Sequence, residues 1–177
     1  MSWYSLAVIL IIAGVANMTP VLVKKLSWLD YSIDGDRSWR GVRVLGNSKT
    51  WRGLVCGVLV AVCTGLALKI VSDYIIVLPL EPLRGGYLEI LQYSAGIGCA
   101  ALVGDLIKSF FKRRIGMVPG KSWIPFDQVD WVVGVLIFLI ITGRFDWNYL
   151  YFLVIGFGLH LVVKWIGWLF KIETKAI

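Results

Sequence analysis

Three aspartates, Asp105, Asp127 and Asp130, stand near the ends of apolar stretches and are the residues best suited to chemistry. An ionisable side chain at membrane depth costs a few kcal/mol, so its presence there indicates a function. Asp127 and Asp130 are three residues apart and would share one face of a helix. Convergent carboxylates repel one another unless a cation lies between them, and ligand sets of oxygen alone select a hard ion, Mg²⁺ before any transition metal. We expect the three aspartates to bind Mg²⁺; the alternative is that they form salt bridges with the basic residues 112–114.

Basic residues follow Asp105 with a helical spacing. Lys108 and Lys112 come three and seven positions after it, which places all three on one helix face. Carboxylates that hold Mg²⁺ beside clustered cations form a clamp for a triphosphate, because the cations neutralise charge that develops on the leaving group. We therefore predict that Lys112 and Arg113 are catalytic together with the three aspartates. Further phosphate contacts in this region are predicted for Ser109, Arg114 and Lys121.

A second basic stretch, Gly46–Gly53, leads directly into an apolar stretch. A glycine-bounded turn before a helix can bind phosphate through backbone N–H groups, and Lys49, Thr50 and Arg52 would assist. The stretch is not a Walker motif, because Ser48 stands where that motif needs Gly. We predict that it binds substrate; the alternative is that its basic residues only face the membrane surface.

These residues must be positioned by helices that cross a membrane. Of the 177 residues 58% are hydrophobic and 16% are charged, whereas about 25% are charged in a typical soluble domain. Five apolar stretches reach or approach the roughly 20 residues that span a bilayer. No element is predicted for the polar residues 26–45. The sequence predicts an all-α integral membrane protein, a single domain over 1–177, with five transmembrane helices near 3–23, 53–72, 90–110, 126–142 and 147–169.

The charges between the helices predict their orientation. Three of the 18 Lys and Arg residues, Lys69, Arg84 and Arg144, would lie on one side of the membrane, and the other fifteen on the opposite side. Basic residues favour the cytoplasmic side, so we expect a multi-pass protein of the cell membrane with its N-terminus outside and its C-terminus in the cytoplasm. The three aspartates and Asn17, a further predicted substrate contact, then line one polar chamber that faces the cytoplasm. The net charge of +7 follows from this topology and from attraction to anionic lipids, and it predicts no nucleic-acid partner.

Cysteine and histidine point to no further chemistry. Cys56 and Cys63 are seven residues apart on one predicted helix, a rise of about 10 Å, which is too far for a disulfide. Cys99 also falls in an apolar stretch. A single histidine without a Cys-x-x-Cys pair argues against zinc, and we interpret His160, midway along the fifth stretch, as a packed residue.

The motifs resemble those of a known family. Residues Gly104–Arg114 read GDLIKSFFKRR, and Asp127–Asp130 read DQVD. Glycine and proline stand between them, at Gly116, Pro119, Gly120 and Pro125. This arrangement resembles the S-x-x-K-R … D-R-x-D signature of the CTP:phosphatidate cytidylyltransferases. It is most similar to their archaeal branch, the CDP-archaeol synthases, with G-D-x-x-x-S-x-x-K-R-R … P-G … D-Q-x-D. Lys49–Gly53 is similar to the K-T-x-R-G that opens the second helix of that branch, and Asn17–Pro20 to its N-x-x-P.

The resemblance implies a CTP-dependent nucleotidyltransferase of phospholipid biosynthesis. CMP would pass from CTP to an unsaturated archaeal diether glycerol phosphate, 2,3-bis-O-geranylgeranylglycerol 1-phosphate, to give CDP-archaeol and pyrophosphate. The implied partners are CTP, this lipid phosphate, Mg²⁺ and the membrane, and a homo-oligomer is left open. Gln128, which stands where the bacterial enzymes have Arg, is a predicted substrate contact. The lipid phosphate is anionic at neutral pH and needs no general base, and its tails would lie in a groove between helices.

Two other functions use similar residues. A CDP-alcohol phosphotransferase also places Mg²⁺ in a membrane, but Asp34-Gly35 does not continue into its D-G-x-x-A-R opening. A small ion or phosphate transporter could use the same charges. A transporter needs access from both sides of the membrane, whereas the charges here concentrate on one side.

Overall fold

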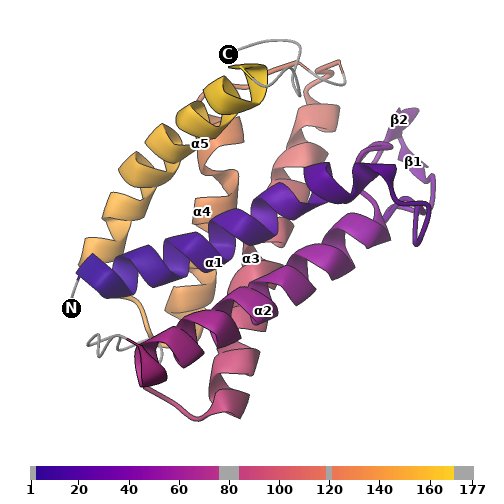
Figure 1. Cartoon of the computed structure of the whole chain (residues 1–177). Coiled ribbons are helices and arrows are strands. Elements are labelled where there is room, and N and C mark those ends of the chain that lie inside the picture. Colours follow the sequence, from indigo (N-terminus) through magenta and orange to yellow (C-terminus); the bar gives the residue numbers. More distant parts are fainter. Residues whose placement is uncertain (1–2, 76–83, 119–120, 170–177) are drawn as a thin grey trace.

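Five α-helices make up most of the computed structural model, which describes residues 3–75, 84–118 and 121–169 (Figure 1). Short 3₁₀ turns, η1 (Val23–Lys25) and η3 (Trp147–Leu150), follow the first helix and precede the last. The helices lie within a few residues of the five predicted stretches: α1 (Trp3–Leu22), α2 (Trp51–Tyr74), α3 (Tyr87–Arg114), α4 (Phe126–Ile141) and α5 (Tyr151–Leu169).

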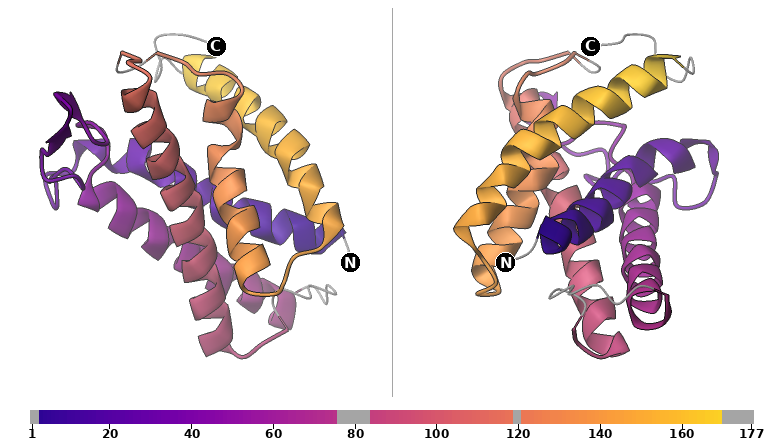
Figure 2. Two further views of the ribbon diagram at one scale, coloured as in Figure 1. Left: turned by 180° about the vertical axis from the view of Figure 1, so that it is seen from behind. Right: turned by 60° about the vertical axis from the view of Figure 1, so that its left-hand side comes forward.

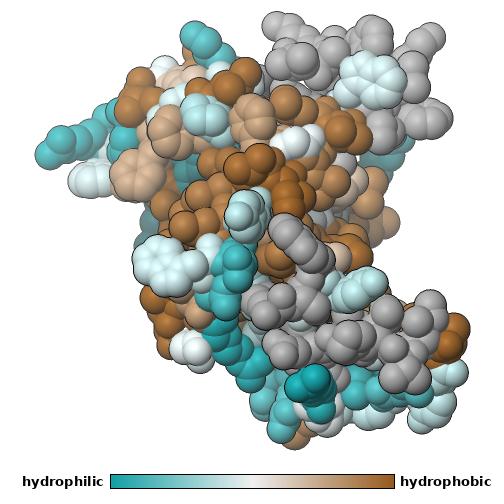
Figure 3. All heavy atoms as spheres, turned by 90° about the vertical axis from the view of Figure 1, so that its left-hand side faces the viewer, coloured by the Kyte–Doolittle hydropathy of each residue, from teal (hydrophilic) through white to brown (hydrophobic). Residues whose placement is uncertain are grey.

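Three of the described helices are long and apolar enough to cross a membrane, over Tyr4–Lys25, Trp51–Tyr74 and Tyr87–Arg114. Helix α4 has 16 residues, and the apolar helical stretch Trp147–Leu159, which covers η3 and the first part of α5, is also shorter. On the face in Figure 3, hydrophobic atoms form a broad central area, and hydrophilic atoms gather toward the upper left and the lower edge. The helical membrane architecture is therefore confirmed, while the count of five spans and their orientation stay predictions.

Helix α3 is central to the bundle. It packs against α1, α2 and α4, while α5 packs mainly against α4. Figure 2 shows α3 and α4 side by side with α1 lying across them. Apolar side chains of all five helices contribute to the core, and the ones with the least exposure include Ile9, Ile12, Ala16, Ala61, Ile97, Ala101, Val132, Val135, Leu139 and Phe152.

Glycines allow α3 and α4 to approach closely beside the predicted site. A Cβ on Gly104 would lie closer than 3.0 Å to the carbonyl oxygen of Asp130 and 3.2 Å from the Cα of Gly134. A Cβ on Gly134 would likewise meet the carbonyl oxygen of Ala100. Backbone atoms cannot turn aside as a side chain can, so these glycines set the distance between the two helices.

Two features differ from the sequence prediction. Helix α3 continues to Arg114, past the predicted end at 110, because its last turn carries Lys112, Arg113 and Arg114, and cations there interact favourably with the helix dipole. The loop between α1 and α2 contains a small antiparallel hairpin of β1 (Ser38–Trp39) and β2 (Val42–Arg43). The three cysteines are free, and Cys56 and Cys63 form no disulfide with each other, as predicted. The side chain of His160 and the Pro119-Gly120 pair lie outside the described residues.

Replacing Gly104 by alanine should destabilise the bundle by about 1–3 kcal/mol, because the new methyl group meets backbone and forces the helices apart. Thermal unfolding of the detergent-solubilised protein measures this as a lower midpoint. Gly158→Ala is the matched control, since a Cβ there meets nothing within 4 Å. Equal midpoints for the two variants would contradict the close crossing of α3 and α4.

Candidate active site

The predicted site residues come together at one end of the bundle. Asp105 lies in the last turns of α3, and Asp127 and Asp130 lie in the first turns of α4. Lys49 belongs to the turn that precedes α2, and Asn17 to the last turns of α1. The convergence that the sequence predicts from helix direction is therefore present in the structure.

The three carboxylates meet at the ammonium group of Lys108. Its Nζ lies 3.0 Å from Asp105 Oδ1, 3.1 Å from Asp127 Oδ1 and 2.7 Å from Asp130 Oδ2. All four side chains are at most 18% exposed. Buried charges are tolerated only when paired, so Lys108 balances the mutual repulsion of the aspartates.

Two further lysines complete the charge balance. Lys49 forms an ion pair with Asp105 and ties the turn before α2 to α3. Lys112 Nζ donates to both oxygens of Asp127 at 3.0 Å and to the carbonyl oxygen of Lys121 at 2.7 Å. Asp127 also accepts from the backbone N–H of Trp123 at 2.7 Å. Three lysines thus face three aspartates. The salt-bridge alternative from the sequence holds for Lys112, whereas Arg113 and Arg114 donate to backbone carbonyls instead.

The chemistry of the donors suits a hard cation, because one oxygen from each of the three carboxylates faces the same point. In this structure the ammonium of Lys108 supplies the positive charge at that point. Within the described residues no group of three or more Asp, Glu, His or Cys side chains is arranged to hold a metal ion. A divalent ion therefore fits the donors only if Lys108 moves away.

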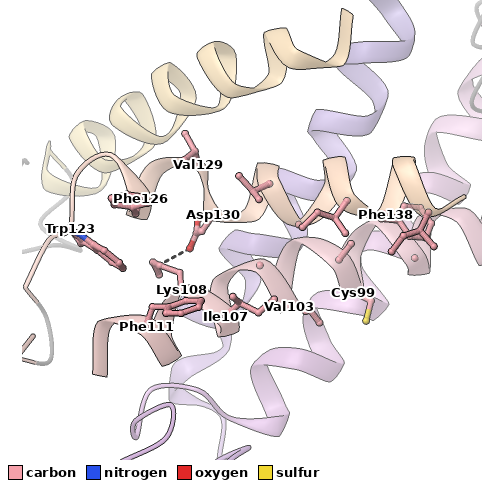
Figure 4. A pocket seen from close by; sticks show the side chains of 17 residues that line it. Cys99, Val103, Ile107, Lys108, Phe111, Trp123, Phe126, Val129, Asp130 and Phe138 are labelled. Carbon is pink, nitrogen blue, oxygen red and sulfur yellow. Dashed lines mark ion pairs between the residues drawn. The ribbon is translucent and has the colours of Figure 1, made fainter. Parts of the chain in front are cut away.

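Two cavities adjoin this cluster. One is an apolar groove of about 680 Å³ between α3 and α4 (Figure 4), lined by side chains such as Val103, Ile107 and Val133. The other is a polar cleft of about 590 Å³. Its lining includes Asn17, Lys24, Asp30, Asn47, Ser48, Lys49, Thr50, Arg52, Asp105 and Asp127.

Lys108 and Asp130 line both cavities. In Figure 4 their side chains point toward each other across the gap between α3 and α4, and a dashed line marks their ion pair. Trp123 and Phe126 lie at this end of the groove, and Phe138 and Cys99 lie at the other. The Lys108–Asp130 pair therefore stands where the apolar groove meets the polar cleft.

Asp34 anchors the loop that carries Lys49. Its side chain is 2% exposed and accepts hydrogen bonds from Arg43 Nη2 at 2.8 Å and from the backbone N–H groups of Leu45 and Gly46 at 3.0 and 3.2 Å. Burial alone would raise the pKa of Asp34. The hydrogen bonds from Arg43 and the two amides outweigh burial, and the pKa lies below its ordinary value of 3.8.

Several predicted phosphate contacts are turned toward the protein itself. Arg114 donates to the carbonyl oxygens of Trp39, Val42 and Arg43 at 2.6–3.0 Å, which fixes the hairpin to the end of α3. Its guanidinium also lies 5.3 Å from the ring centroid of Trp39. Arg113 donates to the carbonyl oxygen of Met117 at 2.8 Å.

Two residues of the turn before α2 combine loop contacts with a place in the cleft. Arg52 pairs with Asp30 at 2.8 Å and donates to the carbonyl oxygen of Leu26. The Thr50 hydroxyl accepts from the N–H of Gly53 and caps α2. Both residues also line the polar cleft.

The remaining predicted contacts lie away from both cavities. Ser109 and Gln128 are buried, and neither is among the residues that line the two cavities. The side-chain amide of Gln128 has no hydrogen-bond partner among the described residues. Lys121 is exposed and contributes its backbone carbonyl to Lys112.

Sequence reasoning missed the central place of Lys108 and the anchoring role of Asp34. The helical spacing of Lys108 from Asp105 was visible, but only the crossing of α3 and α4 shows that it reaches all three aspartates. For Asp34 the sequence offers a weak signal, because Asp-Gly pairs favour turns.

Known proteins resemble this chain along most of its length. The family model described as CarS-like CDP-archaeol synthase matches residues 3–176. A CDP-archaeol synthase of Methanosphaerula palustris is 46% identical over 110 residues, which are 62% of this chain and 63% of that protein. One of Thermococcus onnurineus is 37% identical over 86% of this chain and 81% of its own length.

A solved structure has the same fold. It is that of an intramembrane enzyme for archaeal membrane lipid biosynthesis, with a TM-score of 0.71 and 26% sequence identity. The match covers 88% of this chain and 90% of that one.

Replacing Asp34 by asparagine should free the loop over residues 29–50, because Arg43 loses its buried anionic partner. Amide hydrogen exchange should then show faster exchange at Leu45 and Gly46, by about tenfold or more. Asp36→Asn is the matched control, since Asp36 also pairs with Arg43 but its side chain is 76% exposed.

The same anchor should respond to acid. The pKa of Asp34 is lowered in the folded protein. Its contribution to the stability of the folded loop is therefore complete above the ordinary pKa, and it is lost as the pH falls through the lowered pKa. Protection of Leu45 and Gly46, corrected for intrinsic rates, should be constant from pH 7 to about 5 and fall only below the ordinary pKa near 4. Loss of protection near pH 6 would contradict this assignment.

Proposed function

This chain belongs to the CDP-archaeol synthase family, and from that membership and the geometry of its site we propose that it transfers CMP from CTP to a diether lipid phosphate. The acceptor is an unsaturated archaeal diether glycerol phosphate, 2,3-bis-O-geranylgeranylglycerol 1-phosphate. The products are CDP-archaeol and pyrophosphate. The family's named enzymes are lipid-synthesising transferases, and this member acts in the same class.

One observation carries the proposal: the polar cleft and the apolar groove share the wall formed by Lys108 and Asp130. CTP is a polar anion, and the cleft offers it basic side chains such as Lys24 and Lys49. Four aspartates also line the cleft, and a cation would be needed between them and the phosphates. A diether lipid phosphate has a charged head and apolar tails, and it suits a groove of apolar side chains that ends at an ammonium group. The two reacting phosphates would meet at the Lys108–Asp130 pair.

The reaction is a substitution at the α-phosphorus of CTP. An oxygen of the lipid phosphate forms a new bond to that phosphorus while the bond to the β-phosphate oxygen breaks, and the electron pair leaves with pyrophosphate. A phosphate monoester has a second pKa near 6, so the attacking oxygen is anionic at neutral pH. The protein then needs to position and neutralise phosphates rather than remove a proton.

Lysines of the cleft are the side chains placed to neutralise CTP. Lys49 lines the cleft, and so does Lys24 of the turn η1. Asn17 and Thr50 offer hydrogen bonds to nucleotide or phosphate from the same cleft. Lys112, Arg113, Arg114 and Lys121 would act by holding Asp127, the loop after α3 and the hairpin in place.

Asp105, Asp127 and Asp130 would hold Mg²⁺ once Lys108 has moved from the point that their oxygens face. When bound, such an ion would supply Lewis-acid stabilisation of the negative charge that develops on the leaving pyrophosphate. The aspartates also fix the orientation of Lys49 and Lys112 through their ion pairs.

The topology follows from the same placement. We propose five membrane spans, with the N-terminus outside and the site facing the cytoplasm, where CTP is made. The fifteen-to-three distribution of Lys and Arg across the two sides of the membrane supports this orientation. The lipid would enter from the bilayer along the groove, and its tails would continue into the membrane.

Purified protein in lipid nanodiscs should release pyrophosphate from CTP only when both the lipid phosphate and Mg²⁺ are present. Asp127→Asn should lower the turnover number by about 10²-fold or more, because one carboxylate of the cluster loses its charge. Lys69→Met is the control, since Lys69 pairs with Asp73 within α2, away from both cavities.

Chelation of divalent ions by EDTA should abolish the release, and added Mg²⁺ should restore it. Pyrophosphate release that does not depend on the lipid phosphate would contradict the proposed transfer. Full activity in EDTA would contradict the role of the three aspartates.

A further inference from the structure

Lys108 has two properties that the proposed reaction does not by itself explain. Its ammonium contacts all three carboxylates of the cluster. The same side chain lines the apolar groove as well as the polar cleft. The apolar stem of Lys108 therefore borders the groove in which a lipid would lie, while its ammonium lies among the carboxylates.

The charges of the cluster are already balanced. Three aspartates face Lys49, Lys108 and Lys112 at hydrogen-bond distance. A divalent cation brought into this balanced group would lie next to an ammonium, and like charges at such short range in a poorly hydrated site repel strongly. Binding of the ion therefore requires one lysine to leave.

Lys108 is the lysine whose ammonium occupies the place that the ion would take. Lys112 is held by a backbone carbonyl in addition to Asp127. Lys49 contacts one carboxylate from the edge of the cluster and lies on an anchored turn. The Lys108 ammonium occupies the point that all three carboxylates face, and its flexible stem borders the groove, which provides a direction in which to move.

We propose that Lys108 is an exchangeable cation, which holds the carboxylates together before substrates bind and then moves to the lipid phosphate at the end of the groove when a divalent ion takes its place. This inference rests on the proposed function and assigns Lys108 as a binding residue for the lipid phosphate. The negative charge of the lipid phosphate then replaces the carboxylates as the partner of the Lys108 ammonium. Metal binding and lipid binding thereby become coupled through one side chain.

The coupling has a directional consequence. Without the lipid phosphate, the ammonium competes with the divalent ion, so the substrate-free protein binds that ion weakly. The lipid phosphate attracts Lys108 away and strengthens ion binding, and by linkage the ion strengthens lipid binding by the same factor. Removal of the Lys108 ammonium by substitution should likewise strengthen binding of the divalent ion, even without lipid.

The test measures binding of Mn²⁺ alone, as a spectroscopic probe for Mg²⁺, to the purified protein by electron paramagnetic resonance without CTP or lipid. Lys108→Met should bind Mn²⁺ about tenfold or more tightly than the wild type, because the competing charge is gone. Lys108→Arg keeps the charge and should bind no more tightly than the wild type. Lys69→Met, which removes a lysine from an ion pair elsewhere, should match the wild type.

A second measurement covers variants that fold poorly. In EDTA Lys108→Met should unfold at a lower temperature than the wild type, because the three carboxylates share fewer cations. Mn²⁺ should raise the thermal unfolding midpoint of this variant by more than it raises that of the wild type. Lys108→Gln, which can still donate a hydrogen bond to the carboxylates, provides the same comparison if the methionine variant does not fold. Tighter Mn²⁺ binding or a larger midpoint rise supports the exchange.

Mn²⁺ affinity of Lys108→Met at or below the wild-type value overturns the exchange. Pyrophosphate release by the wild type separates this failure from that of the proposed function. An active wild type with unchanged Mn²⁺ affinity in Lys108→Met refutes only the exchange, whereas a wild type that releases no pyrophosphate with CTP and lipid phosphate refutes the transfer itself. In the active enzyme Lys108→Met should raise the KM for the lipid phosphate more than that for CTP.

Discussion

Charge pairing among three aspartates and three lysines at one end of an apolar helix bundle is the constraint on which the rest of the structure depends. Each of these groups loses solvation when the helices pack, and the loss is offset only if every charge has a close partner of opposite sign. The partners come from α3, α4 and the turn before α2. The glycine crossing at Gly104 and Gly134 brings α3 and α4 close enough for Lys108 to reach across.

The same cluster borders both a polar cleft and an apolar groove. The proposed transfer of CMP from CTP to a membrane lipid would bring a water-soluble and a lipid-soluble reactant to one point. The polar cleft and the apolar groove reach the Lys108–Asp130 pair from different surroundings. Loop contacts complete the cleft, since the carboxylate of Asp34 and the guanidinium of Arg114 hold the segment that carries Lys49. Asp34 and Arg114 therefore help to fix the position of Lys49.

Much of this arrangement could be predicted from sequence, because the positions of apolar and charged residues along the chain indicate where each helix lies and which residues stand at its ends. Helix bounds followed from apolar length, and the convergence of Asp105 with Asp127 and Asp130 followed from the alternating direction of the helices. The partner of these aspartates could not be predicted, because Lys108 reaches Asp127 and Asp130 only through the angle and spacing at which α3 and α4 cross. Arg114 was predicted from its charge to bind phosphate, and its contacts with the hairpin depend on a loop fold that hydropathy does not encode.

Photolabelling tests most directly the central claim that lipid and nucleotide meet at the Lys108–Asp130 pair. A lipid phosphate analogue with a diazirine a few carbons from the glycerol would be bound to the protein in nanodiscs, irradiated, and its attachment sites mapped by mass spectrometry. We predict labels on groove residues of α3 and α4 near Lys108, such as Ile107 and Val133, and their loss when excess unlabelled lipid phosphate is added. Labels confined to α2 or to the outer face of α5, equally displaced by that competitor, would contradict the account.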